Sequence, residues 1–399
     1  IGFTVFSNIK LLKRPTFWFI AILSAVLFLP HVLWQVHHHY PSINYHLYER
    51  SSGTYDPLRT LVYLPGQFLM AGPLIGWLLF GYALTIKVKD GFIRCLLVNF
   101  IGTILFFMLS TIKDDVQSHW TFIAFAPLLL LVMIRFGQTG WNPRWLTRLA
   151  IFNTIIIVLL RIGLMLGLPF ITHSSRFQSY YGYREWARQV KQRVGDNYVI
   201  LISGFQEASK YDYYTRSLKG FAYDTREYRR TQFDIWPIED SLQHKRAYYL
   251  MDHKGEGLVQ DSFKTARGTW YGMWIDSINT FQKVNIRTDI HRIKTRPGGQ
   301  VVFNLTITNP YNHTINFKNA PYPHEVVMAA CFIQHDVNKY AQRAGPKFEA
   351  ISIAPHQAAH YNFTLKAPMK KGKYEMIFSI RTSPFPGGRN SRPVNFTVE

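Results

Sequence analysis

Five apolar runs, each long enough to cross a lipid bilayer, follow one another in the first 170 residues of the chain. A membrane-spanning helix needs about 20 consecutive, mostly apolar residues. The runs that meet this requirement are residues 16–36, 61–86, 92–111, 120–136 and 145–169. A bundle of soluble helices is the alternative, but it would have little polar surface to offer water. We therefore predict a polytopic α-helical membrane region of about five spans over residues 1–170.

The charged residues are concentrated in the rest of the chain. Residues 171–399 hold 32 of the 45 Lys and Arg residues, and the whole chain has a formal net charge of +21. A hydrophobic content of 48% excludes a disordered chain. The basic residues lie between and after the apolar runs, so the charge does not indicate a nucleic-acid partner. It is typical of a basic soluble part beside the anionic headgroups of a lipid bilayer.

The basic residues between the runs predict which way the chain crosses the membrane. Loops rich in Lys and Arg stay on the cytoplasmic side. One side has nine such residues and the other has three. The nine are Lys10, Lys13, Arg14, Lys87, Lys89, Arg94, Arg135, Arg144 and Arg148, and the three are Arg50, Arg59 and Lys113. With five spans, loops 37–60 and 112–119 and everything after residue 170 then lie outside the cytoplasm.

The soluble part shows two different periodicities, which predict two domains. Residues 182–194 have helical spacing, the short apolar segment 198–202 is typical of a strand, and segments 233–236 and 247–251 are predicted to be further strands. Helices that alternate with strands predict a small α/β unit, which we place at residues 171–282.

After residue 283 apolar and polar residues alternate, as in 301–307 and 374–380, with Gly and Pro turn signals between the segments. Seven or eight short strands of this kind predict an immunoglobulin-like β-sandwich over residues 283–399.

The first outward loop is rich in histidine and aromatic residues. Residues 34–50 read Trp-Gln-Val-His-His-His-Tyr-Pro-Ser-Ile-Asn-Tyr-His-Leu-Tyr-Glu-Arg. An interfacial aromatic belt is one explanation. A zinc site at residues 37–39 is a second, although consecutive histidines on a loop point in different directions. The third is a pocket for a sugar joined to a lipid phosphate, since aromatic faces pack on sugar rings and Arg binds phosphate. Its candidate binding residues are His39, Tyr40, Tyr45, His46 and Arg50.

Three cationic or titratable side chains in later segments are further candidates for binding a phosphate. Lys113 and His119 lie in the second outward loop, and Arg161 lies inside the fifth apolar run. A charge at the centre of a span costs about 2.5–3.5 kcal/mol, so such a residue normally faces a polar cavity or a partner. A glycosyl transfer with inversion also needs a carboxylate as general base. The candidates outside the cytoplasm are Glu49, Asp56, Asp114 and Asp115.

Several short motifs point to one family. They are Pro30-His31-Val32-Leu33-Trp34-Gln35, His39-Tyr40-Pro41-Ser42-Ile43, Tyr45-His46-Leu47 before Arg50, Gly66-Gln67 with Gly72-Pro73, Lys113 with His119-Trp120-Thr121, and residues 206–211 and 229–236. Together they resemble the multi-spanning lipid-phosphate-sugar glycosyltransferases of bacteria. That group is related to the aminoarabinose transferases of lipid A and to the dolichyl-phosphate-mannose protein mannosyltransferases. The resemblance covers about residues 20–250.

This resemblance implies a GT-C type fold and transfer of a sugar from a polyprenyl-phosphate donor to a glycan, lipid or protein acceptor of the envelope. The reaction would take place on the outer face of a bacterial inner membrane. In that family the general base lies in an outward loop near the amino terminus, and no matching acidic motif precedes residue 16. We therefore expect the chain to be the carboxy-terminal portion of such an enzyme, inactive alone, with its catalytic residue upstream.

Two alternatives remain open at the level of sequence. The chain could be a non-enzymatic membrane anchor or transport component whose sandwich binds glycan or envelope protein. It could also be a metal-dependent hydrolase that uses residues 37–39. No cofactor is assigned, and a divalent metal remains an option. Cys95 lies in an apolar run and Cys331 in the soluble part, so we expect no disulfide between them.

Overall fold

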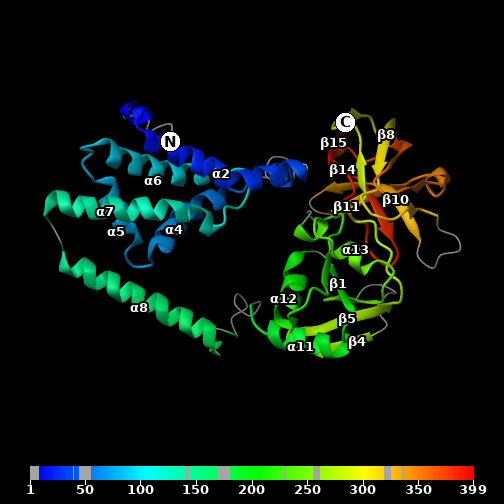
Figure 1. The fold of residues 1–399 in the computed structure, drawn as a ribbon, viewed down its shortest axis with the longest axis horizontal. Coiled ribbons are helices and arrows are strands. Elements are labelled where there is room, and N and C mark those ends of the chain that lie inside the picture. Colours follow the sequence, from blue (N-terminus) through cyan, green and yellow to red (C-terminus); the bar gives the residue numbers. More distant parts are fainter. Residues whose placement is uncertain are drawn as a thin grey trace. The chain divides into compact units, whose positions relative to one another are not determined.

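The computed structural model describes residues 9–38, 40–44, 55–140, 143–168, 172, 180–202, 204–228, 231–254, 261–318, 325–334 and 337–399. The chain divides into two compact units, Ile1–His173 and Ser174–Glu399. The first unit is helical, and the second contains all the strands that the described ranges hold (Figure 1). Long apolar helices are thus followed by a strand-rich region with several sheets. The domain boundary expected near residue 282 stays a prediction.

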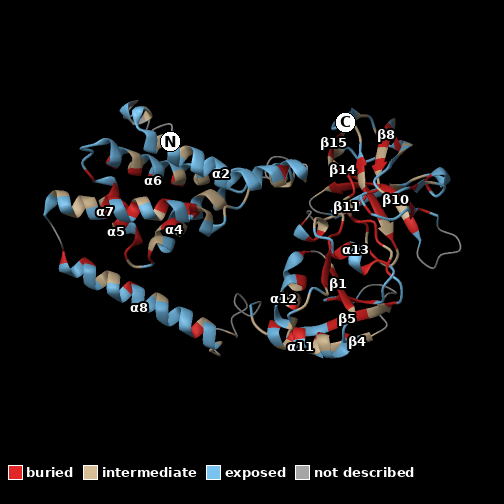
Figure 2. Cartoon of the chain, in the orientation of Figure 1, coloured by how far each residue is buried: buried red, intermediate tan, exposed pale blue. Residues whose placement is uncertain are grey.

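Four helices of the first unit, within the described ranges, are long and apolar enough to cross a membrane. They are α2 (Pro15–His37), α6 (Gly91–Ser110), η3 (Ser118–Ala124) continued by α7 (Phe125–Thr139), and α8 (Arg144–Leu166). Two short helices, η1 (Ile9–Lys13) and α3 (Pro41–Asn44), flank α2. Most apolar side chains of α2 and α8 are exposed (Figure 2), which is typical of helices that face lipid. The first unit is that of a membrane protein.

The predicted span over residues 61–86 is not one helix. It consists of α4 (Pro57–Ala71) and α5 (Gly76–Leu84), which meet at an angle of 97°. The break falls at Gly72 and Pro73. Gly72 has a φ of +146°, which a residue with a side chain rarely adopts, and proline has no N–H to continue the helical hydrogen bonds. The sequence signal for the break was present, but it does not give the angle.

The bent pair nevertheless joins opposite ends of the helix bundle. At one end, the Thr60 and Thr111 hydroxyl oxygens lie 2.7 Å apart, just after α6 ends. At the other end, Lys87 N donates to Gln138 Oε1 at 3.2 Å, just before α6 begins. The 20 residues of α6 separate these ends by about 30 Å at 1.5 Å per residue. We therefore count α4 and α5 as one broken span, which gives the described part of the chain up to five spans.

A polar side chain from α8 stabilises the break. Asn153 is only 4% exposed, and its Oδ1 accepts a hydrogen bond from Leu74 N at 2.9 Å. This N–H belongs to the segment between α4 and α5, where no helical carbonyl is available to it. In a bilayer, backbone groups freed by a helix break must find such a partner because water is absent. Asn153 thus explains why an amide lies inside an apolar helix.

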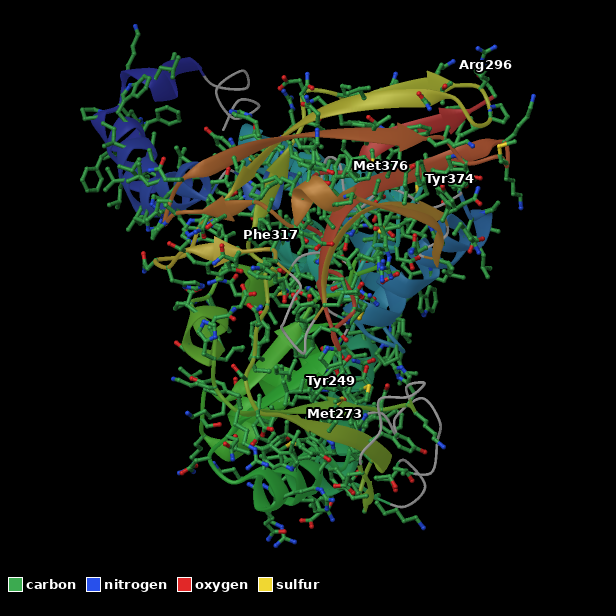
Figure 3. All side chains as sticks on the ribbon, turned by 90° about the vertical axis from the view of Figure 1, so that its right-hand side faces the viewer. Tyr249, Met273, Arg296, Phe317, Tyr374 and Met376 are labelled. Carbon is green, nitrogen blue, oxygen red and sulfur yellow. The ribbon has the colours of Figure 1, made fainter. Side chains whose placement is uncertain are left out.

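The second unit begins with a mixed five-stranded sheet in the order β2-β1-β3-β5-β4. The strands are β1 (Tyr198–Ile202), β2 (Gly220–Tyr223), β3 (Ala247–Met251), β4 (Asp261–Thr265) and β5 (Gly268–Ile275). Strand β1 pairs in parallel with β2 and β3, and β5 pairs antiparallel with β3, where Tyr249 lies opposite Met273 (Figure 3). The longer helices between the parallel strands and before them are α11 (Tyr183–Val194) and α12 (Phe205–Thr215). Trp186 of α11 is fully buried in their common core.

One expected strand is a helix instead. Residues 233–236 overlap the 3₁₀-helix η4 (Gln232–Asp234), which precedes the short helix α13 (Ile238–Leu242). Thr231 and Asp234 form a capping box. The Thr231 side chain accepts a hydrogen bond from the backbone of the first helical turn, and the Asp234 side chain accepts one from the backbone N–H of Thr231. Three apolar residues among the four of this segment do not distinguish a strand from a short helix, and the capping box favours the helical turn.

The remaining strands are β6 (Asn285–Arg287), β7 (Arg292–Thr295), β8 (Gln300–Thr308), β9 (Ile315–Asn316), β10 (Val326–Gln334), β11 (Val337–Arg343), β12 (Ser352–Ile353), β13 (Ala358–Lys366), β14 (Gly372–Thr382) and β15 (Val394–Val398). Their sheets have the orders β11-β10-β14-β15-β7, β13-β8-β6 and β12-β9. Of these strands, β8, β13 and β15 alternate more buried with more exposed side chains, whereas most side chains of β10 and β14 are buried on both faces. Phe303 of β8 and Phe363 of β13 each pack against Phe378 of β14, at 5.3 Å between ring centroids. The contacts join the sheet β13-β8-β6 to the sheet β11-β10-β14-β15-β7. These two sheets therefore share one apolar core.

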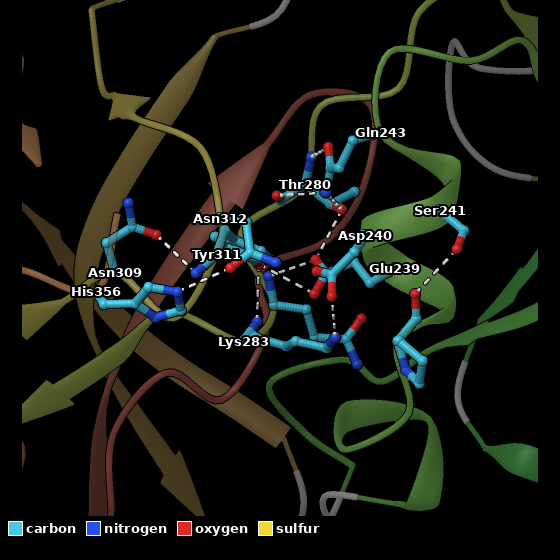
Figure 4. Close-up of polar contacts among 12 residues, drawn as sticks. Glu239, Asp240, Ser241, Gln243, Thr280, Lys283, Asn309, Tyr311, Asn312 and His356 are labelled. Atoms are coloured by element: carbon cyan, nitrogen blue, oxygen red, sulfur yellow. Dashed lines mark hydrogen bonds and ion pairs between the residues drawn. The ribbon is translucent and has the colours of Figure 1, made fainter. Parts of the chain in front are cut away.

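A buried carboxylate joins the two cores of the second unit (Figure 4). Glu239 of α13 is fully buried, and its oxygens accept hydrogen bonds from Thr280 Oγ1 at 2.8 Å, Gln282 N at 2.9 Å and Tyr311 Oη at 3.0 Å. Tyr311 follows β8, and Thr280 lies in the segment between β5 and β6. Burial raises the pKa of the Glu239 carboxyl, and the donors around it oppose that rise.

Candidate functional site

Half of the predicted binding residues can be located. Arg50, His39, Tyr45 and His46, together with Glu49, lie outside the described residues. The other four belong to the first unit and are exposed: Tyr40 after α2, Lys113 after α6, His119 in η3 and Arg161 in α8. The side chain of Arg161 therefore lies on an exposed side of its helix. The predicted donor site formed by all eight residues stays a prediction.

Tyr40 contributes to a cavity at the end of α2. The cavity has a volume of about 460 Å³ and is lined mainly by apolar atoms. Its polar floor is Gln35, which is 5% exposed and whose Nε2 donates to Ser42 Oγ at 2.6 Å. The backbone of Tyr40 has a φ of +59°, and its N–H donates to the Gln35 carbonyl at 2.6 Å. The cavity holds no charged side chain among its lining residues, so it offers shape but little chemistry.

A second, smaller pocket combines charge with polar groups, and we call it the Arg59 pocket. Its volume is about 260 Å³. It lies where α4 begins and α6 ends, at one end of the helix bundle. The lining residues are Asp56, Leu58, Arg59, Val62, Tyr63, Gly66, Gln67, Thr111, Asp115, Val116 and Ser118. Both outward loops that the sequence marks as donor-side therefore contribute to it through their described residues.

The mouth of the Arg59 pocket carries the charges. Arg59 Nε lies 2.9 Å from Asp115 Oδ1, and the two side chains are 27% and 76% exposed. Asp56 is the N-cap of α4, where its Oδ1 accepts from Leu58 N at 2.9 Å. A carboxylate is favoured there because the first N–H groups of a helix lack helical partners. The mouth thus presents one guanidinium and two carboxylates.

The floor of the Arg59 pocket is neutral and tightly hydrogen-bonded. Gln67 is 2% exposed and Thr121 is fully buried, and the Thr121 hydroxyl donates to Gln67 Oε1 at 2.5 Å. Beside them, the Tyr63 hydroxyl donates to the Ile104 carbonyl at 3.1 Å. A guanidinium at the mouth can bind a phosphate through two parallel hydrogen bonds. The floor offers neutral hydrogen-bonding groups and no charge.

Sequence reasoning found part of this pocket and missed the rest. Asp56 and Asp115 were among the candidate carboxylates, whereas Arg59 was only counted among the basic loop residues. Gln67 was noted in a family-like motif without a role. The available signal was the Asp-Pro start of a helix, because it fixes Asp56 as a cap and therefore orients Arg59 three residues later.

For metals, the described ranges contain no group of three His, Cys, Asp or Glu side chains that could hold an ion.

Comparison with known proteins identifies no family for the chain. No protein-family model matches the sequence, and no curated protein matches it either. Among solved structures, the ASH / PapD-like domain of human CEP192 (PapD-like domain 7) is similar over 31% of this chain and 92% of its own, with 15% identity. Its TM-score is 0.17, so this likeness carries no argument about fold or function.

Proposed function

We propose that the chain is part of a membrane glycosyltransferase that takes a sugar from a polyprenyl-phosphate donor and passes it to an envelope acceptor. The observation that supports this most is the Arg59 pocket. It places one guanidinium and two carboxylates over a neutral, hydrogen-bonding floor, at one end of a bundle of apolar helices. Lipid phosphates occupy the same depth as the ends of such helices, so a phosphate-bearing lipid is the ligand that fits.

The roles follow from the chemistry of the side chains. Arg59 binds the donor phosphate, because its pairing with Asp115 is only partly buried and the phosphodiester anion, which offers two oxygens to a guanidinium, competes for it. Asp56 and Asp115 are then the carboxylates within the pocket that can receive the acceptor proton. Lys113 and His119 lie in the same outward loop region as Asp115. Lys113 adds positive charge there, as the sequence predicts for the donor side.

The finer architecture belongs to the same proposal. We propose a bacterial inner membrane, with the Arg59 pocket and the second unit on its outer face. The basic residues support this orientation, since Lys87, at the end of the bundle opposite Thr60, belongs to the side with nine Lys and Arg residues. An immunoglobulin-like sandwich for residues 283–399 is supported by the core that Phe303, Phe363 and Phe378 share across two sheets.

Donor binding can be measured on the chain itself. The chain is placed in nanodiscs of neutral lipid, titrated with undecaprenyl phosphate or with undecaprenol, and the bound lipid is counted by native mass spectrometry. We expect the phosphate to bind more tightly than the alcohol. Because hydrogen bonds to charged groups contribute about 1.5–3 kcal/mol, Arg59→Gln should weaken phosphate binding about ten- to hundredfold.

The matched control is Arg94→Gln. Arg94 is an exposed arginine of α6 at the opposite end of the bundle, so its loss should leave lipid binding unchanged. Equal binding of phosphate and alcohol by the wild type would refute the proposal and favour a non-enzymatic anchor.

A further inference from the structure

The floor of the Arg59 pocket contains a polar side chain that the proposed function does not yet use. Gln67 is 2% exposed, yet it lines the pocket. Its Oε1 accepts the Thr121 hydroxyl at 2.5 Å, which leaves Nε2 at the other end of the amide. Among the described residues, no hydrogen bond is made by the other end, Nε2. A buried amide therefore presents an N–H₂ group to the neutral floor of the pocket.

The distance from the charged mouth defines what this amide can reach. Arg59 and Gln67 are eight residues apart on α4, which corresponds to two turns and about 12 Å along the helix axis. A phosphate held by Arg59 therefore does not extend to Gln67, whereas a group attached to that phosphate does. The walls between them are largely apolar, since Val62, Tyr63 and Gly66 line the same pocket.

The size of the cavity limits the attached group. A volume of about 260 Å³ is below the range of about 300–1,000 Å³ that is usual for drug-sized ligands. It suits one sugar ring and excludes an oligosaccharide. The hydroxyl groups of a sugar ring suit an amide N–H₂ that lies beside an aromatic side chain. The amide can donate to the hydroxyl oxygens without requiring a charge.

We propose that Gln67 is a specificity-determining residue that binds a hydroxyl group of a single sugar, inserted into the pocket with its phosphate on Arg59. This rests on the proposed function and extends it, because it assigns to one residue the recognition of the sugar part of the donor. Thr121 is a positioning residue that orients the Gln67 amide. Together they distinguish a lipid phosphate that carries a sugar from one that does not.

The test compares lipids with and without the sugar. The full chain in neutral nanodiscs is titrated with undecaprenyl phosphate and with its glucosyl, mannosyl and galactosyl esters. The wild type should bind at least one ester more tightly than the sugar-free lipid. Gln67→Met keeps the length of the side chain but removes the amide. It should weaken binding of that ester about three- to tenfold, as the loss of one or two neutral hydrogen bonds does, and change binding of undecaprenyl phosphate less than twofold.

Two further variants separate binding from folding. Gln67→Met leaves no buried hydroxyl unpaired, because Thr121 Oγ1 also lies 3.0 Å from the Ser118 carbonyl, which then accepts its proton. Gln138→Met is the matched control, since Gln138 bonds the Lys87 backbone at the other end of the bundle. Thr121→Val should give a partial loss for the sugar ester alone, because the amide is then free to turn.

The outcomes distinguish the two proposals. If the wild type binds neither kind of lipid phosphate, the proposed function fails. If it binds undecaprenyl phosphate but none of the three esters more tightly, or if Gln67→Met weakens all four lipids equally, the assignment of Gln67 is overturned and the proposed function stands.

Discussion

Replacing Glu239 with alanine should loosen the joint between the two cores of the second unit. The carboxylate is fully buried and accepts three hydrogen bonds, from Thr280 Oγ1, Gln282 N and Tyr311 Oη. Alanine leaves these donors without an acceptor and opens a cavity. An orphaned buried donor costs about 1–3 kcal/mol, but removing the carboxylate also relieves the cost of burying it. We therefore expect a net loss of about 3–4 kcal/mol in the free energy of unfolding, within the range found for broken buried networks.

Two further variants at the same position show whether hydrogen bonds or volume are responsible. Glu239→Gln keeps the shape and one acceptor oxygen, and the Tyr311 hydroxyl can turn to accept from the new amide. It should cost about 1 kcal/mol or less. Glu239→Leu fills a similar space without polar atoms, so it should be nearly as harmful as alanine.

The measurement is urea unfolding of the full chain in detergent. Hydrogen exchange of the backbone amides of β1 and β10 reports the unfolding of each core. At a slope of about 2–3 kcal/mol per M, alanine should lower the midpoint for both strands by about 1–2 M. A leucine variant as stable as the wild type, or an alanine variant that unfolds at the wild-type midpoint, would show that the network does not hold the two cores together.

Two other predictions concern single buried side chains. Burial raises the pKa of Asp212 to about 7. Between pH 4 and 7 the folded state therefore holds the carboxyl proton more tightly than the unfolded chain does. The free energy of unfolding then falls as pH rises through that range, by about 1.4 kcal/mol per pH unit. Asp212→Asn should flatten this dependence and raise the urea midpoint of α12 and β2 at pH 8; a wild-type midpoint that is the same at pH 5 and pH 8 would contradict this. Asn153→Leu removes the acceptor of Leu74 N at the helix break and should lower stability in detergent by about 1–2 kcal/mol, measured by thermal size-exclusion chromatography. The matched Asn99→Leu, on an exposed site of α6, should have no such effect, and Asn153→Asp should recover part of the loss because it still offers an oxygen.

Local patterns in the sequence carried much of the fold. Runs of about 20 apolar residues favour a helix in a membrane, because a helix lets nearly all backbone groups bond within their own segment. Alternation of period two, as in β8 and β13, likewise leaves one face to bury. The exceptions were also local. The run over residues 61–86 broke at Gly72, and in place of the strand expected at 233–236 a capping box starts the 3₁₀-helix Gln232–Asp234.

The candidate pocket depended instead on contacts between distant parts of the chain. Gln67 and Thr121 are 54 residues apart and bond only because α4 and η3 pack together, and Glu239 reaches Tyr311 across 72 residues. A sequence shows that such residues are polar and lie in apolar surroundings, but not which of them meet. The amino-acid sequence by itself determined the kind of each element, since that depends on neighbours a few residues away. Only the tertiary structure decided which polar groups become partners, because burial leaves each one dependent on whatever the folded chain brings within hydrogen-bonding distance.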